Sequence, residues 1–289
     1  MKSIVQEFKQ SYIKMILKNV KLIISLLIIT AFSSCEDVID VNLNTAEPKL
    51  VIDASIKWQK GTVGNNQKIK LTTTTSYYNN IIPIVSGATV FIINSTNTVF
   101  NFIETPATGE YLCNDFIPII DETYTLTVIY NGNTYVSTDK LISTPIIETI
   151  EQETVQGLSG DEIQIKFFYQ DNGLQNNYYL IGFKKSGIIF PEYGVLDDKF
   201  FQGNQMFGFY TNEELNPTNT LDMTLQGITL RYYNYMNKLI NIAGSAGGSP
   251  FATAPATLRG NIINQTNSAN YPLGYFHLSE IDLKNYIVL

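Results

Sequence analysis

The sequence predicts a mostly β protein, with an antiparallel β-sandwich over residues 49–145 and a second β-rich, α+β domain over residues 146–289. Three observations predict this fold class. Apolar and polar residues alternate in many short runs, which is the period of a half-buried strand. Turn residues separate these runs. Aromatic residues make up 12% of the chain and charged residues only 16%, a balance typical of β-rich proteins.

The strands of the first domain follow one another at short spacing. In the first of them, Leu50, Ile52, Ala54 and Ile56 share one face. The pair Asn131-Gly132 predicts a two-residue hairpin, because both residues tolerate the positive φ that this turn needs. Seven short strands separated by turns suggest a sandwich, and they are expected at residues 49–57, 67–75, 88–93, 98–103, 111–113, 123–130 and 134–138.

The second domain begins after Pro145 with an exit strand at 146–154. Two alternating segments, 163–169 and 178–184, suggest a hairpin across Asp171-Asn172-Gly173. One helix is expected from Leu230 to Ala243, capped by Thr229 and ended by Gly244. Its apolar face would hold Ile228, Tyr232, Tyr235, Leu239 and Ile242. The Gly-rich run 244–255 predicts a loop, and strands return at 258–264 and 274–278.

The first 34 residues have the order of a lipoprotein signal peptide. Lysines up to Lys21 precede an apolar run from Leu22 to Phe32, which is too short to span a membrane but suits a signal sequence. Ser33 and Ser34 then lead into Cys35, although position −3 holds Phe32 where Leu is usual. We expect cleavage before Cys35 and lipidation of its thiol. A plain thiol after a signal anchor, or the end of an uncleaved membrane helix, is the alternative.

The residues around this signal raise two further expectations. Reading from Met15 instead of Met1 gives a more ordinary signal length, so Met15 is a candidate initiator. Residues 35–48 follow neither the strand nor the helix period and end at Pro48, which predicts a lipidated tether. Several acyl chains, at about 0.8 kcal/mol for each buried CH₂, would anchor it stably.

Charge excludes one class of partner and limits the mode of membrane attachment. The first 34 residues hold five lysines and one acid, so their removal leaves 14 of the 19 basic and 25 of the 26 acidic side chains. A surface this acidic repels phosphate backbones, which argues against nucleic-acid binding. It also repels anionic headgroups, so the membrane has to be reached through the lipid anchor.

Several short segments follow one another along the chain in a characteristic order. They are Pro48-Lys49-Leu50-Val51-Ile52-Asp53, Gly87-Ala88-Thr89-Val90, Gly109-Glu110-Tyr111, Tyr124-Thr125-Leu126-Thr127-Val128 with Gly132 and Tyr135, Asn177-Tyr178-Tyr179, Arg259-Gly260-Asn261-Ile262 and Leu273-Gly274-Tyr275-Phe276. Their order and spacing resemble the Bacteroidetes lipoproteins of the domain-of-unknown-function 4249 (DUF4249) family, over nearly the whole chain after Cys35. The resemblance implies an immunoglobulin-like first domain, a place at the outer membrane, and a TonB-dependent receptor as a neighbour, but no catalytic residues.

Residues suited to catalysis or metal binding are few. His277 is the only histidine, and although a triad with Ser279 or Glu280 can be imagined, we interpret it as a half-exposed strand residue. Cys113 is the only other cysteine, so we expect a small core residue and no internal disulfide or zinc site. Asp171-Asn172-Gly173 and Asp197-Asp198 lack calcium-loop spacing and are interpreted as solvated turns. No cofactor is predicted.

Aromatic residues interleaved with glycines stand out between residues 190 and 210. Aromatic rings on loops give a binding protein contact area at little entropy loss, while a sheet core is the interpretation that we favour. The candidate ligand contacts are Phe190, Tyr193, Phe200, Phe201, Phe207 and Tyr210. We therefore expect a non-catalytic outer-membrane lipoprotein that assists a TonB-dependent transporter in nutrient uptake. The alternatives are a structural or adhesive surface module and, last, a hydrolase.

Overall fold

The computed structural model describes residues 16–21, 47–76, 79, 81–157, 160–245 and 258–289. Residues 16–21 are helical, and no helix within the described ranges is long and apolar enough to cross a membrane. Met1, Met15, Cys35 and the tether as far as residue 46 lie outside these ranges, as does most of the predicted loop 244–255. Residues Glu47–Leu289 form one structural unit.

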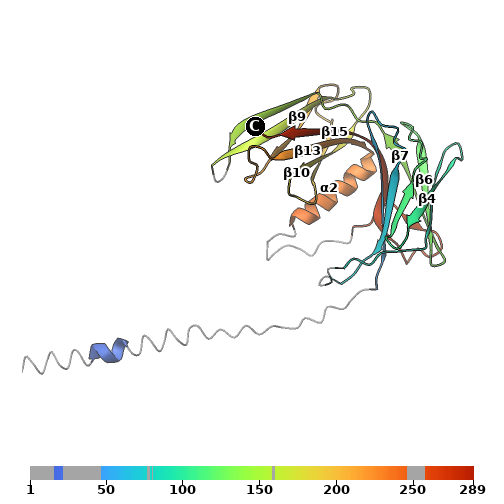
Figure 1. Ribbon diagram of the computed structural model, residues 1–289, viewed down its shortest axis with the longest axis horizontal. Helices are drawn as coiled ribbons and strands as arrows, with labels where there is room; N and C mark the ends of the chain where they lie inside the picture. The colour runs from blue at the N-terminus through green and yellow to red at the C-terminus, as the bar shows by residue number, and fades with distance from the viewer. Residues whose placement is uncertain (1–15, 22–46, 77–78, 80, 158–159, 246–257) are drawn as a thin grey trace, which may run out of the picture. The chain divides into compact units, whose positions relative to one another are not determined.

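Eight strands of this unit close into a barrel (Figure 1). The strand order is β15-β1-β2-β5-β4-β3-β6-β7. The barrel closes where β7 pairs with β15, with Leu141 opposite Leu278. Strand β15 lies parallel to both neighbours, β1 and β7. The bounds are β1 (Leu50–Gln59), β2 (Gln67–Thr73), β3 (Thr89–Asn94), β4 (Val99–Thr105), β5 (Glu110–Cys113), β6 (Thr123–Tyr130), β7 (Asn133–Ile142) and β15 (Leu273–Ile287).

The mostly β prediction is confirmed, but the immunoglobulin-like sandwich predicted for residues 49–145 is wrong in its architecture. The seven predicted strands exist, and the Asn131-Gly132 hairpin is confirmed by positive φ at both residues and by the Tyr130–Asn133 pair. They form one closed sheet because β15, from the far end of the chain, lies between β1 and β7. The first 145 residues give no indication that residues 273–281 supply the strand that closes this sheet.

The barrel interior is filled by the inward residues of every strand. Leu50, Ile52, Ala54 and Ile56 are buried as their alternation predicts. Cys113 is also buried, which confirms it as a core residue, and burial raises the pKa of its thiol to about 11. The barrel is therefore a packed core and not a channel.

The second half of the unit is a pair of packed sheets. One sheet continues the barrel wall in the order β11-β10-β13-β15, and the other has the order β12-β9-β8. Tyrosine, phenylalanine and leucine side chains fill the space between them, among them Phe167, Tyr169, Tyr179, Phe183 and Leu225. The bounds are β8 (Thr149–Gln156), β9 (Asp161–Gln170), β10 (Tyr178–Lys185), β11 (Glu192–Asp197), β12 (Gln205–Thr211) and β13 (Thr220–Ile228), and a short strand β14 (Ile263–Asn264) pairs with β7.

Strand β15 belongs to both halves, as Figure 1 shows near the C-terminus. Its residues 273–281 pair with β1, and its residues 281–287 pair with β13. The division of the chain at Pro145 stays a prediction. The sequence indicated β15 only as far as Leu278, because Asp282, Lys284 and Asn285 interrupt the alternation.

Helix α2 (Leu230–Ser245) packs against β10 and β11. The Oγ1 of Thr229 accepts a hydrogen bond from the N–H of Tyr232 at 3.3 Å, which confirms the predicted cap. Gly244 lies inside the last turn and does not end the helix. The buried face also differs from prediction, since Met236 is buried while Leu239 is 37% exposed. Tyr232 and Tyr235 of the helix both pack against the ring of Tyr275 on β15.

Candidate functional site

Two turns that are distant in sequence lie side by side at one end of the second pair of sheets. The first, residues 171–177, joins β9 to β10, and the second, residues 198–204, joins β11 to β12. Backbone hydrogen bonds link them, from the N–H of Asp171 to Asn204 O at 3.1 Å and from the N–H of Asp198 to Asn177 O at 3.3 Å. The two turns therefore form one structural element.

The carboxylate of Asp171 lies at the base of this element. It is 4% exposed. Its Oδ1 accepts a hydrogen bond from the hydroxyl of Tyr179 at 2.6 Å, and its Oδ2 accepts one from the N–H of Gly203 at 2.9 Å. Burial and the bond to Asp171 raise the pKa of the Tyr179 hydroxyl, which keeps it protonated as the donor. A buried carboxylate thus fixes one turn upon the other.

Asp198 performs the reciprocal role from the second turn. It is 2% exposed, and its Oδ2 accepts a hydrogen bond from the N–H of Asn177 at 2.8 Å. Two glycines permit the close approach: a Cβ placed on Gly173 would lie 2.8 Å from the Cα of Gly203. Any side chain at Gly173 would push the turns apart, so the base is both satisfied in hydrogen bonds and tightly packed.

Apolar side chains project from this base into solvent. Leu174 is 92% exposed, Phe200 is 82% exposed and Phe201 is 49% exposed. We name these three residues the apolar tip. Exposed apolar groups on a rigid base lose little entropy on binding, which makes the tip suited to contact an apolar group of a partner or ligand.

The predicted ligand-contact aromatics do not form one surface. Phe200 and Phe201 belong to the apolar tip. Phe190 is 78% exposed but lies in the turn between β10 and β11, which is at the opposite end of β10. Tyr193 packs beneath α2, and Tyr210 is 5% exposed with its hydroxyl donating to Glu192 Oε1 at 3.0 Å.

Phe207 occupies a third position, the outer face of the β12-β9-β8 sheet. It is 45% exposed, and its ring centroid lies 5.9 Å from that of Phe168 on β9. Phe209, two residues along β12, is 54% exposed on the same face. The alternation of β12 therefore places Met206, Gly208 and Tyr210 inside and leaves the two phenylalanines outside.

His277 differs from its predicted half-exposed position, because it is 2% exposed on β15. Desolvation, and secondarily the charge of Lys57, lower its pKa to about 3. The structure does not assemble a triad: the Oγ of Ser279 bonds to Gln226, and the carboxylate of Glu280 accepts from Lys60. Neither ring nitrogen of His277 has a hydrogen-bond partner among the described residues.

The two acidic turns considered for calcium are also not the solvated turns that were expected. Asp171 and Asp198 are buried. Both carboxylate oxygens of Asp171 and the Oδ2 of Asp198 accept hydrogen bonds from protein donors. Asp197 accepts a hydrogen bond from the hydroxyl of Tyr233 at 3.2 Å. Within the described ranges, no three acidic, histidine or cysteine residues are grouped so that they would hold a metal ion.

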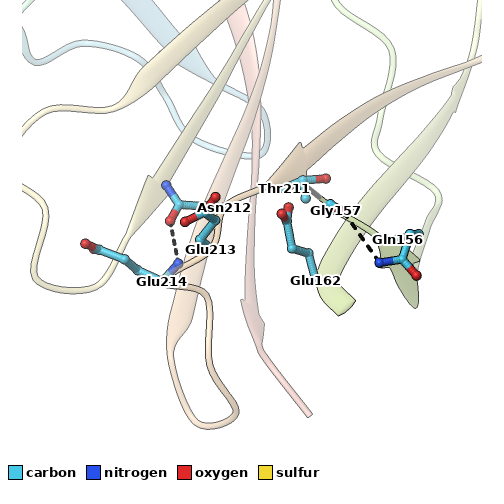
Figure 2. Close-up of a pocket in the computed structure, with 7 residues that line it drawn as sticks. All are labelled: Gln156, Gly157, Glu162, Thr211, Asn212, Glu213 and Glu214. Carbon is cyan, nitrogen blue, oxygen red and sulfur yellow. Dashed lines mark hydrogen bonds between the residues drawn. The ribbon is translucent and has the colours of Figure 1, made fainter. Parts of the chain in front are cut away.

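A hollow of about 710 Å³ lies at the other end of the second pair of sheets (Figure 2). Glu162, Glu213 and Glu214 line it together with neutral residues. Figure 2 shows Asn212 bonded to the N–H of Glu214, which holds the turn after β12. The lining is acidic, so anionic ligands are disfavoured there.

Sequence reasoning identified Phe200 and Phe201 but missed Leu174 and the buried roles of Asp171 and Asp198. An exposed leucine between Gly173 and a run of Gln and Asn carries no local signal of function. The sequence indicates each of the two aspartates only as a residue of its own turn. Their pairing depends on tertiary contacts between two hairpins.

Comparisons with solved structures give weak likenesses. A fibronectin type III two-domain segment of chicken tenascin is 8% identical, covering 62% of this chain and 90% of that one, with a TM-score of 0.21. Bovine butyrophilin is 9% identical, with coverages of 62% and 92% and a TM-score of 0.23. A DUF4785 family protein of Legionella pneumophila is 11% identical, with coverages of 62% and 51% and a TM-score of 0.25.

Comparisons of sequence are more informative. No curated protein matches the chain. A family model described as a domain of unknown function, DUF4249, matches residues 36–284. The match begins directly after Cys35 and spans the barrel, both sheets and the helix.

Proposed function

This chain belongs to the DUF4249 family, and from that membership, its N-terminal sequence and the apolar tip we propose a non-catalytic, lipid-anchored binding protein of the outer membrane. The resemblance to Bacteroidetes lipoproteins implies a TonB-dependent receptor as a neighbour, and we propose that the partner is such a transporter, in nutrient uptake. The observation that carries the binding role is the apolar tip: three exposed side chains on a base held by two buried carboxylates.

The rigidity of the base supports a binding role over a merely solvated loop. The carboxylates of Asp171 and Asp198 accept the hydrogen bonds from Tyr179, Gly203 and Asn177 described above, and charge-assisted bonds of this kind are the stronger ones. An isolated exposed phenylalanine is common on protein surfaces. The apolar tip instead carries three exposed apolar side chains on two turns that are hydrogen-bonded to each other.

Attachment to the membrane is supported by the sequence around Cys35. Substitution of Cys35 by Ser removes the thiol that would carry the lipid. We expect the wild-type chain to incorporate an alkyne-labelled fatty acid and to fractionate with the outer membrane, and Cys35→Ser to do neither. Cys113→Ser is the matched control, since it changes the other cysteine and leaves labelling intact. Labelling of Cys35→Ser would contradict the anchor.

The partner is tested by mild detergent extraction of cells that express the tagged full chain. We expect an outer-membrane barrel protein to co-purify. The double substitution Phe200→Ser/Phe201→Ser should reduce its recovery at least tenfold, because the exposed rings supply the contact, while Phe190→Ser at the other end of β10 should not. Equal recovery of the barrel protein with all variants would show that the apolar tip is not part of the interface.

If no outer-membrane barrel protein co-purifies with the wild-type chain or with any variant, the structural or adhesive alternative is favoured. In that case a deletion strain would change in surface attachment or envelope integrity while its nutrient uptake stayed normal. Uptake that falls in the deletion strain, and recovers with the wild-type chain but not with Phe200→Ser/Phe201→Ser, supports the transport role.

A further inference from the structure

Strand β12 has an open edge. It lies at one end of the β12-β9-β8 sheet, and among the described residues its hydrogen-bonded neighbour is β9 alone. An edge strand presents a row of backbone donors and acceptors that another strand can use. Natural proteins protect such edges with charges, prolines, bulges or a covering element.

The other exposed edges of the two sheets are protected in these ways. Strand β8 carries Glu151 and Glu153, and the amide of Gln152 on β8 bonds to the backbone of Leu289. Strand β11 has an acid at each end and is packed against α2. Strand β12 reads Gln-Met-Phe-Gly-Phe-Tyr-Thr, without a charge or a proline. Within the described ranges it has no protecting device.

The residues of β12 are symmetric about Gly208. Phe207 and Phe209 lie on the outer face, while Met206 and Tyr210 lie on the inner face. If two copies pair antiparallel about Gly208, Phe207 of each copy faces Phe209 of the other on the same side of the sheet. Opposed aromatic residues are among the favourable cross-strand pairs. The strand is therefore complementary to itself in the way that a two-fold interface requires.

Charges at the two ends of β12 are also complementary. Lys199 lies in the turn before the strand, and Glu213 and Glu214 follow it. Antiparallel pairing brings the start of one strand to the end of the other. Lys199 of each copy then approaches the acidic end of its partner, whereas a parallel arrangement would place like charges together.

From the open edge, the uncharged sequence and this symmetry, we propose that two copies of this chain associate through antiparallel pairing of β12, centred on Gly208. The two three-stranded sheets become one six-stranded sheet, with Phe207 and Phe209 of the two copies forming two cross-strand pairs on its outer face. A strand–strand contact of seven residues is a small interface. The inference does not depend on the proposed transporter or on the lipid anchor.

The test uses the full chain in mild detergent, followed by analytical ultracentrifugation over a concentration series. Wild type should reach a dimer as concentration rises, and the series is repeated at low and high salt, because salt screens both the repulsion between two acidic copies and the attraction between the strand ends. Phe207→Lys and Phe209→Glu should each weaken self-association at least tenfold. Both side chains are about half exposed, so the fold should tolerate the changes, and circular dichroism checks this.

The register is tested by mixing the two single variants. In the mixed pair, the lysine introduced by Phe207→Lys in one copy faces the glutamate introduced by Phe209→Glu in the other. The unchanged Phe209 of the first copy and the unchanged Phe207 of the second still face each other. The mixture should therefore dimerise more tightly than either variant does alone. Phe190→Lys and Phe190→Glu are the matched controls, and they should leave the wild-type dimer unchanged.

Three results would overturn the proposal. Wild type that stays monomeric at all concentrations and salts excludes self-pairing, and a β12-dependent contact with another protein would then assign the edge to that protein. A wild-type dimer that survives both β12 variants uses another surface. Variants that fail to pair when mixed, while wild type dimerises, contradict the antiparallel register.

Discussion

The imidazole ring of His277 lies against the phenol ring of Tyr232, with 3.8 Å between the ring centroids and 14° between the ring planes. His277 comes from the outer wall of the barrel and Tyr232 from helix α2. This stack therefore joins the helix to the strand that both halves of the unit share. The ring contributes as an aromatic surface, since both of its nitrogens lack partners among the described residues.

Substitution of His277 by Phe should stabilise the protein. The stack on Tyr232 is kept, and the buried N–H that has no partner is removed, which is worth about 1 kcal/mol in the free energy of unfolding. His277→Ala, which leaves a cavity under Tyr232, should lower the same quantity. Urea unfolding followed by tryptophan fluorescence measures both. A stability loss in His277→Phe as large as in His277→Ala would show that the nitrogens make an essential bond.

Stability should fall in acid because of the same residue. The unfolded chain protonates His277 below about pH 6.5, whereas the folded chain holds its pKa at about 3. The contribution of neutral His277 to the free energy of unfolding is therefore complete above pH 6.5. It is lost as pH falls from 6.5 toward 3, at up to about 1.4 kcal/mol per pH unit. His277→Phe should lose this part of the slope. Parallel slopes for wild type and variant between pH 6.5 and 4 would contradict the assignment.

Glu280 should be important for closing the barrel. Its Oε2 accepts hydrogen bonds from the Nζ of Lys60 at 2.8 Å and from the N–H of Thr144 at 3.0 Å. Glu280→Ala leaves the buried N–H of Thr144 unpaired and should lower the free energy of unfolding by about 2–4 kcal/mol. Glu280→Gln retains an acceptor and should lose less. Equal losses in the two variants would show that packing, not hydrogen bonding, decides the effect.

Gly173→Ala should loosen the base of the apolar tip. The new Cβ would lie 2.8 Å from the Cα of Gly203, so the turns must separate, at a cost of about 1–3 kcal/mol. Hydrogen–deuterium exchange should become faster in residues 171–177 and 198–204 together. Gly187→Ala is a control, because its turn lies elsewhere and a Cβ there meets open space, although its φ of +84° is strained. Unchanged hydrogen–deuterium exchange in both turns of Gly173→Ala would show that the two turns are not coupled.

Local patterns in the sequence determined much of the fold. The alternation in β1, the hairpin at Asn131-Gly132, the burial of Cys113 and the helix after Thr229 were all predicted, because each depends on neighbours along the chain. The strands β11, β12 and β13 were missed. Their aromatic and glycine content left a sheet core and a set of loop-borne ligand contacts both open, and only sheet pairing shows that Tyr210 faces inward while Phe207 faces outward.

The sequence by itself determined that this chain is mostly β, belongs to its family and contains one capped helix. The tertiary structure decided that β15 closes a barrel, that His277 is buried against Tyr232, and that Asp171 and Asp198 support one apolar tip. The physical reason is the same in each case. Side-chain period sets which face of a strand is apolar, but the strand that lies beside it is chosen by packing and hydrogen bonding across long distances in the chain.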